Sequence, residues 1–107
     1  MYIFGGIGDG SINSKLFNDM IDLNTVDLSL STLNQPTAPT PRAGYSATLL
    51  SNGVIVYIGG LELGNGNTFQ TPDIAQIVIF NTNTLSWSTA VCTNKSTKDY
   101  DQSIFYF

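Results

Sequence analysis

VIVYIGG, at residues 54–60, is the stretch that decides the fold class of this chain. Five β-branched, aliphatic or aromatic residues, the types enriched in strands, run directly into two glycines. A shorter copy, MYIFGG, occupies residues 1–6, which puts Gly59 54 positions after Gly5 (59 − 5). The repetition predicts a strand that ends in Gly-Gly and occurs twice.

A second pair of matching segments lies downstream of the two glycine pairs. MIDLNTVDLSLSTL at 20–33 and IVIFNTNTLSWSTAV at 77–91 each read as a strand, an Asn-Thr turn and another strand. Leu30 matches Trp87, which lies 57 positions later (87 − 30). The sequence therefore contains an internal repeat, and the longer spacing downstream indicates a longer loop in the second copy.

A leading strand is predicted before the second glycine pair, at YSATLLS. Its Ser46 follows Leu30 by 16 positions (46 − 30), and Ser103 follows Trp87 by the same interval (103 − 87). QSIFYF at 102–107 is therefore predicted to be the leading strand of a third copy. Together the predicted strands are 1–5, 18–23, 27–33, 45–51, 54–59, 75–81, 85–91 and 102–107.

The connections between these strands also have sequence signals. Asn52-Gly53 between apolar runs predicts a two-residue hairpin turn. The proline-rich stretch at 34–44 predicts an extended crossover that stays out of any sheet interior. The Gly- and Asn-rich stretch at 61–73 predicts a long loop, and no segment predicts a helix.

Composition narrows the function classes. Only 11% of residues are charged and the net charge is −4, with four Lys and Arg that form no cluster, so nucleic acid is not an expected partner. No apolar run approaches the roughly 18 residues of a membrane span. The chain has no histidine, which excludes a Ser-His-Asp triad and any His-ligated metal site within it. The single cysteine, Cys92, is interpreted as structural, no cofactor is predicted, and the compartment is left open.

Repeats of about 50 residues with four strands and a Gly-Gly after the second strand resemble the kelch repeat. The stretch 41–91 carries the resemblance most fully, with Pro-Arg, Tyr-Ser-Ala, the glycine pair, Val-Ile-Phe-Asn and a tryptophan in order. The resemblance implies an all-β fold of antiparallel four-stranded kelch-like propeller blades, as in the central domain of galactose oxidase. It implies a partial blade of three strands at 1–34, a complete blade at 41–91 and the leading strand of a further blade at 102–107. It also implies that the chain is a fragment of a larger propeller.

Seven residues of these motifs are predicted to be structural. The glycines would allow close backbone approach, the aromatic residues would supply buried area between sheets, and the arginine would form hydrogen bonds between blades. They are Gly5, Gly6, Arg42, Tyr57, Gly59, Gly60 and Trp87.

Function is expected in the loops that the rigid sheets present. The candidate binding-loop residues are Asp9, Asn65, Asn67, Phe69 and Gln70. We expect a non-catalytic module that binds a protein partner. Two alternatives stay open: part of a galactose-oxidase-like or sugar-processing enzyme with its catalytic residues outside this chain, and a secreted or cell-surface propeller that binds a glycan.

Overall fold

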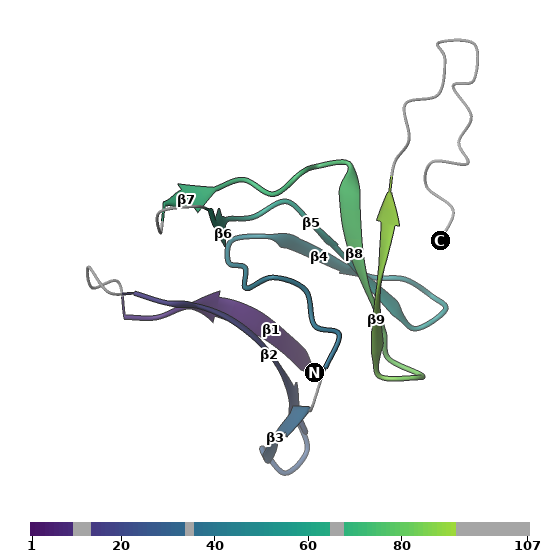
Figure 1. The fold of residues 1–107 in the computed structure, drawn as a ribbon. Helices are drawn as coiled ribbons and strands as arrows, with labels where there is room; N and C mark the ends of the chain where they lie inside the picture. Colours follow the sequence, from purple (N-terminus) through teal and green to yellow (C-terminus); the bar gives the residue numbers. More distant parts are fainter. Residues whose placement is uncertain (10–13, 34–35, 65–67, 92–107) are drawn as a thin grey trace, which may run out of the picture.

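The computed structural model describes residues 1–9, 14–33, 36–64 and 68–91 (Figure 1). Within these ranges the chain is all-β: it contains three antiparallel sheets and no helix. The predicted strand at 102–107, Cys92, and the candidate loop residues Asn65 and Asn67 lie outside the described residues.

The first sheet contains β1 (Tyr2–Ile7), β2 (Leu16–Leu23) and β3 (Leu30–Leu33), in the order β1-β2-β3. β1 was predicted to end at the glycines, but it continues through them to Ile7. The register shifts between Phe4 and Gly6, where Gly5 of β1 lies opposite two residues of β2. β2 begins two residues before the predicted start. β3 begins three residues after it, because the residues before Leu30 belong to the preceding turn.

The second sheet contains β4 (Ser46–Leu49), β5 (Val54–Ile58), β8 (Gln76–Asn81) and β9 (Ser86–Val91), in the order β4-β5-β8-β9. All four strands lie where the sequence places them, with ends that differ by at most two residues. β5 corresponds to β1, β8 to β2 and β9 to β3. The first sheet therefore has no counterpart of β4 among the described residues, and β1 is one of its edges.

A third, small sheet lies in the segment that was predicted to be a strandless loop. β6 (Glu62–Leu63) pairs with β7 (Phe69–Gln70) as a short hairpin. The prediction was wrong because two-residue strands leave no alternation pattern to read between glycine and asparagine residues.

The turn between β4 and β5 also differs from its prediction. Leu50 N donates to Val54 O and Gly53 N to Leu50 O, which leaves a three-residue loop rather than the two-residue Asn52-Gly53 turn. Only Gly53 has a positive φ, +82°, as expected for a turn followed by one left-handed residue. The three-residue loop forms because the pairing of Leu49 with Ile55 fixes the strand ends on either side.

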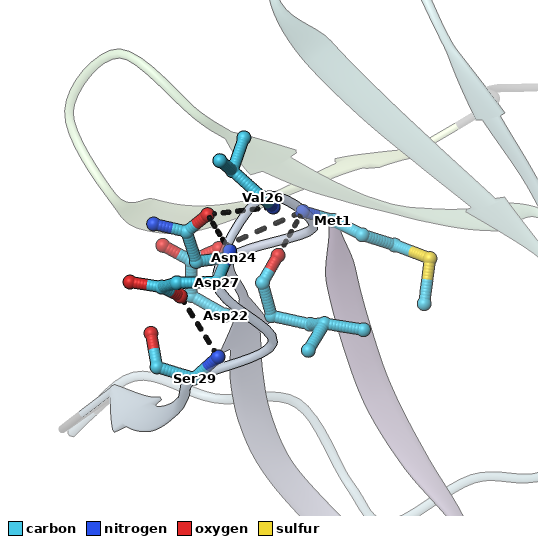
Figure 2. A network of polar contacts seen from close by, with 7 residues as sticks. Met1, Asp22, Asn24, Val26, Asp27 and Ser29 are labelled. Carbon is cyan, nitrogen blue, oxygen red and sulfur yellow. Dashed lines mark hydrogen bonds and ion pairs between the residues drawn. The ribbon is translucent and has the colours of Figure 1, made fainter.

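Equivalent turns join the last two strands of each large sheet. In the first, Asn24 Oδ1 accepts hydrogen bonds from the backbone N–H groups of Val26 and Asp27 (Figure 2). In the second, Asn81 Oδ1 accepts from Asn83 and Thr84. The two asparagines are 57 positions apart (81 − 24), the same interval that separates Leu30 from Trp87.

Each of these turns ends with a leucine in the left-handed region, Leu28 at φ +61° and Leu85 at φ +53°. These are the only non-glycine residues with positive φ in the described ranges, and they are also 57 positions apart (85 − 28). The repeat seen in the sequence is therefore also present in the backbone conformation, with a left-handed leucine at the same position of each copy.

The core lies between the two large sheets. Phe4 and Met20 of the first sheet pack against four buried residues of the second: Tyr57, Val78, Phe80 and Trp87. The ring of Phe4 lies 4.6 Å from that of Trp87 and 5.5 Å from that of Tyr57, centroid to centroid. The other face of the second sheet carries a separate apolar cluster formed by Val54, Val56, Ile77 and Ile79.

Candidate functional site

The crossover between the two large sheets pairs with the first sheet and with the start of the β6–β7 hairpin through two consecutive residues. Arg42 O accepts a hydrogen bond from Gly6 N at 2.8 Å, and Arg42 N donates to Phe17 O at 3.2 Å, so Arg42 is bonded to the first sheet. Ala43 exchanges two hydrogen bonds with Leu61, directly after the second glycine pair. This short stretch of extended chain therefore fixes the first sheet relative to the base of the β6–β7 hairpin.

In each glycine pair, one glycine lies close to the backbone of this crossover. A Cβ atom on Gly5 would lie 2.6 Å from Arg42 O, and one on Gly60 would lie 2.8 Å from Ala43 O. Gly6 and Gly59 have open space around them but, like the other two, have positive φ. In each pair, one glycine permits a close backbone approach and both permit a conformation that L-residues rarely adopt.

The side chain of Arg42 is buried, with 4% of the residue exposed. Its Nη2 lies 3.9 Å from Glu62 Oε2, and Nε and Nη1 have no hydrogen-bond partner among the described residues. Glu62 also accepts hydrogen bonds from Thr40 Oγ1 (2.9 Å) and Gln70 Nε2 (3.2 Å). Glu62 thus connects the β6–β7 hairpin to the crossover through three neighbours.

The hairpin has two different faces. Glu62 and Gln70 are paired on the face that the crossover anchors, whereas Leu63 and Phe69 are paired on the other face. Leu63 is 41% exposed and Phe69 is 49% exposed. We call these two side chains the hairpin surface. The face of the hairpin away from the crossover is therefore apolar and open to solvent.

Tyr45, directly before β4, and Tyr57 of β5 complete the junction beside Phe4. The hydroxyl of Tyr45 donates a hydrogen bond to Phe4 O, and the ring of Tyr45 lies 5.1 Å from that of Tyr57. Burial raises the pKa of both phenols, and for Tyr57 the neighbouring Tyr45 raises it further. Both phenols are therefore neutral over the ordinary pH range, Tyr45 as a hydrogen-bond donor to Phe4 O and Tyr57 as a packed ring.

An apolar cavity of about 500 Å³ opens beside this junction, between the start of β1 and the face of β4. Residues of both sheets line it, among them Tyr2, Ala47, Leu49 and Ile55. We call it the β1–β4 groove. Leu49 is 65% exposed there, so part of the apolar lining of the groove is open to solvent.

The structure brings some of the predicted residues together and not others. Arg42, Tyr57, Trp87 and the four glycines all belong to the junction between the sheets or to its edges. Of the candidate binding residues, Phe69 and Gln70 form β7, with only Phe69 on the hairpin surface, whereas Asp9 follows the end of β1.

Sequence reasoning missed three residues of these sites. Glu62 lies two positions after the second glycine pair. As a lone acidic residue beside that motif, it could have been chosen as a candidate from the sequence. Leu63 and Leu49 carried no signal, because single leucines next to turns are common on protein surfaces.

The described residues contain no group of three or more His, Cys, Asp and Glu side chains placed to hold a metal ion. In the same part of the chain, no helix is long and apolar enough to cross a membrane. The polar groups at the junction hold the two sheets and the hairpin in place.

Comparison with known proteins gives a distant similarity. No protein-family model matches the chain. Over 100 residues the chain is 35% identical to a Rho GTPase-activating protein, gacHH, of Dictyostelium discoideum. The aligned region includes 91% of this chain but only 6% of that much longer protein. The similarity therefore relates this chain to a small region of the relative.

Proposed function

We propose that the chain is a segment of a kelch-type β-propeller and that it acts as a non-catalytic protein-interaction module. Two features support the propeller. The strand plan, the glycine pairs and the left-handed leucines recur along the chain, and successive units pack face to face around Phe4. Radial repetition of such sheets is the architecture of propellers.

The hairpin surface is the observation that carries the proposed binding role. Leu63 and Phe69 are held outward because the opposite face of the hairpin is anchored by Glu62 to Thr40 and Arg42. An anchored apolar pair loses little conformational entropy when a partner covers it, so it is suited to serve as a binding anchor.

The similarity to gacHH agrees with this role. A GTPase-activating protein acts on another protein, and the region it shares with this chain is about 6% of its length. We infer that this chain, which is similar to a small region of that relative, also contacts a protein.

Site-specific photocrosslinking tests the hairpin surface. A photoreactive phenylalanine analogue replaces Phe69 in one sample and Ile74, which is 77% exposed outside the hairpin surface, in a matched control. We expect a protein from the source cells to be captured at position 69 and not at 74. The same protein, purified, should then bind the unmodified chain and bind Leu63→Ser at least tenfold more weakly, about 1.4 kcal/mol.

The proposal fails if positions 69 and 74 capture the same proteins, or if Leu63→Ser binds the captured protein as tightly as the unmodified chain does. Ile74→Ser provides the control for nonspecific loss of an exposed apolar side chain.

A further inference from the structure

The β1–β4 groove has the size and lining of a small-molecule site. Its volume of about 500 Å³ lies within the range of roughly 300–1,000 Å³ that such sites occupy. Both large sheets contribute to it, the first through the start of β1 and the second through Ala47, Leu49 and Ile55. The side chains of these three residues are apolar, so the groove favours an apolar occupant.

Aromatic rings form another part of the lining. Tyr45 and Tyr57 line the groove together, with ring centroids 5.1 Å apart and ring planes at 75° to each other. Tyr2 lines it from the side of β1. An aromatic occupant would gain edge-to-face or offset contacts with such rings beyond the area that it buries. The three tyrosines therefore favour an aromatic molecule over an aliphatic one of the same size.

The groove offers nothing that would balance a charge on its occupant. None of the described residues that line it has a charged side chain. The amino group of Met1 is engaged elsewhere, because it donates a hydrogen bond to Leu23 O at 2.7 Å and lies 3.7 Å from Asp22 (Figure 2). A charged occupant would lose hydration without gaining a counter-ion, which is unfavourable. The occupant is therefore neutral.

One buried hydroxyl of the lining is left without a partner in the described part of the chain. The hydroxyls of Tyr45 and Thr82 donate hydrogen bonds to Phe4 O and Gly53 O. Tyr57 is 2% exposed, and its hydroxyl has no hydrogen-bond partner among the described residues. Buried hydroxyls are normally hydrogen-bonded. Because burial raises the pKa of Tyr57, its hydroxyl keeps its proton and can donate a hydrogen bond to a ligand.

We propose that the β1–β4 groove binds a neutral aromatic small molecule through a hydrogen bond from the Tyr57 hydroxyl to an acceptor on that molecule. The ring of the ligand packs against Tyr2 and the apolar side chains of β4 and β5. Its acceptor, a carbonyl or ether oxygen, lies at the Tyr57 hydroxyl. This inference does not depend on the hairpin surface, which is formed by other residues.

NMR titration of the full chain with related probes tests the proposed ligand class. Acetylnaphthalene is aromatic and neutral and has a carbonyl acceptor, ethylnaphthalene lacks the acceptor, and naphthoate has a negative charge instead. We expect acetylnaphthalene to cause saturable shifts in the amide signals of Ala47, Ile55 and Tyr57. Naphthoate should cause no saturable shift of these signals, and binding of naphthoate as tight as that of acetylnaphthalene would overturn the inference.

Substitutions assign the binding to the groove and to the hydroxyl. Tyr57→Phe keeps the ring and should weaken binding of acetylnaphthalene about tenfold while leaving that of ethylnaphthalene unchanged. Leu49→Asp, at a side chain that is 65% exposed, should abolish binding of both neutral probes without disturbing the core. Ile74→Asp, at a residue that is 77% exposed and outside the groove, is the matched control and should bind both as the unmodified chain does.

Three results overturn the inference. The first is equal weakening of both neutral probes by Tyr57→Phe, and the second is binding that persists in Leu49→Asp. The third is the absence of saturable shifts in the unmodified chain, which is the result expected if a segment of protein fills the groove. The second and third need no change at Tyr57, so they decide the matter even if Tyr57→Phe does not fold.

Discussion

The two large sheets follow one strand plan, yet equivalent positions on them carry different side chains. The second sheet presents Tyr57, Phe80 and Trp87 to its neighbour, and Trp87 is only 9% exposed. The first sheet carries aliphatic residues at the equivalent positions, Ile3, Leu23 and Leu30, and Leu30 is 66% exposed. The repeat therefore fixes where strands and turns lie, while the side chains decide which face is packed.

The largest expected effect comes from the two residues that precede the glycine pairs. Phe4 contacts three aromatic rings of the second sheet, whereas its counterpart Ile58 is 43% exposed. We expect Phe4→Ala to lower the free energy of unfolding by about 3–5 kcal/mol, because it leaves a cavity between the sheets.

Ile58→Ala should cost less than about 1 kcal/mol, because an exposed side chain loses little packing. Urea unfolding followed by tryptophan fluorescence measures both, and Phe4→Leu provides a milder variant if Phe4→Ala does not fold. Equal losses for Phe4→Ala and Ile58→Ala would mean that the two sheets do not pack through Phe4.

The next largest effect is a difference in stability between substitutions of Gly59 and of Gly60. Gly60→Ala would bring a Cβ atom to 2.8 Å from Ala43 O, at a φ of +96°, whereas Gly59→Ala meets open space at a φ of +75°. We expect Gly59→Ala to cost about 1–2 kcal/mol from backbone strain alone and Gly60→Ala about 3 kcal/mol, because the carbonyl must also move. Thermal melts followed by circular dichroism would show this order, and the reverse order would contradict the close approach of the crossover.

Alkaline pH should weaken the junction through its two phenols. The pKa values of Tyr45 and Tyr57 are raised by burial, so the unfolded chain releases these protons before the folded chain does. Their contribution is therefore fully present below about pH 10 and is lost as the pH rises through the folded pKa values.

The urea midpoint, measured from about pH 8 to pH 11, checks this sign. Tyr57→Phe should show a shallower alkaline fall than the unmodified chain, since it removes one of the two groups. A fall that is equally steep in Tyr57→Phe would assign the alkaline effect to other groups.

The smallest effect concerns the turns that the two sheets share. Leu28 and Leu85 both have left-handed backbones, but Leu28 is 74% exposed and Leu85 is 42% exposed. Leu28→Gly should stabilise the chain by about 0.5–1 kcal/mol through relief of strain. Leu85→Gly should gain less because it loses more side-chain contact, and destabilisation by Leu28→Gly in urea unfolding would contradict the left-handed assignment.

Much of the fold could be predicted from the sequence because the same strand and turn signals occur in both copies of the repeat. The seven strands of the two large sheets follow from apolar runs, the glycine pairs and the Asn-Thr turns. The left-handed leucines could not be predicted, since leucine has no preference for that conformation.

The sites were less predictable than the fold. The β6–β7 hairpin depends on Glu62, whose hydrogen bonds with Thr40 and Gln70 join residues that carry no shared pattern. The β1–β4 groove arises from the absence of a fourth strand among the described residues of the first sheet, and such an arrangement becomes visible only in three dimensions.

Nuclear Overhauser contacts of the Phe4 ring test the central claim most directly, which is that two copies of one repeat pack face to face. The account predicts strong contacts from the ring protons of Phe4 to those of both Tyr57 and Trp87, consistent with ring centroids 5.5 and 4.6 Å apart. Contacts of Phe4 confined to Met20 and other residues of its own sheet would contradict it.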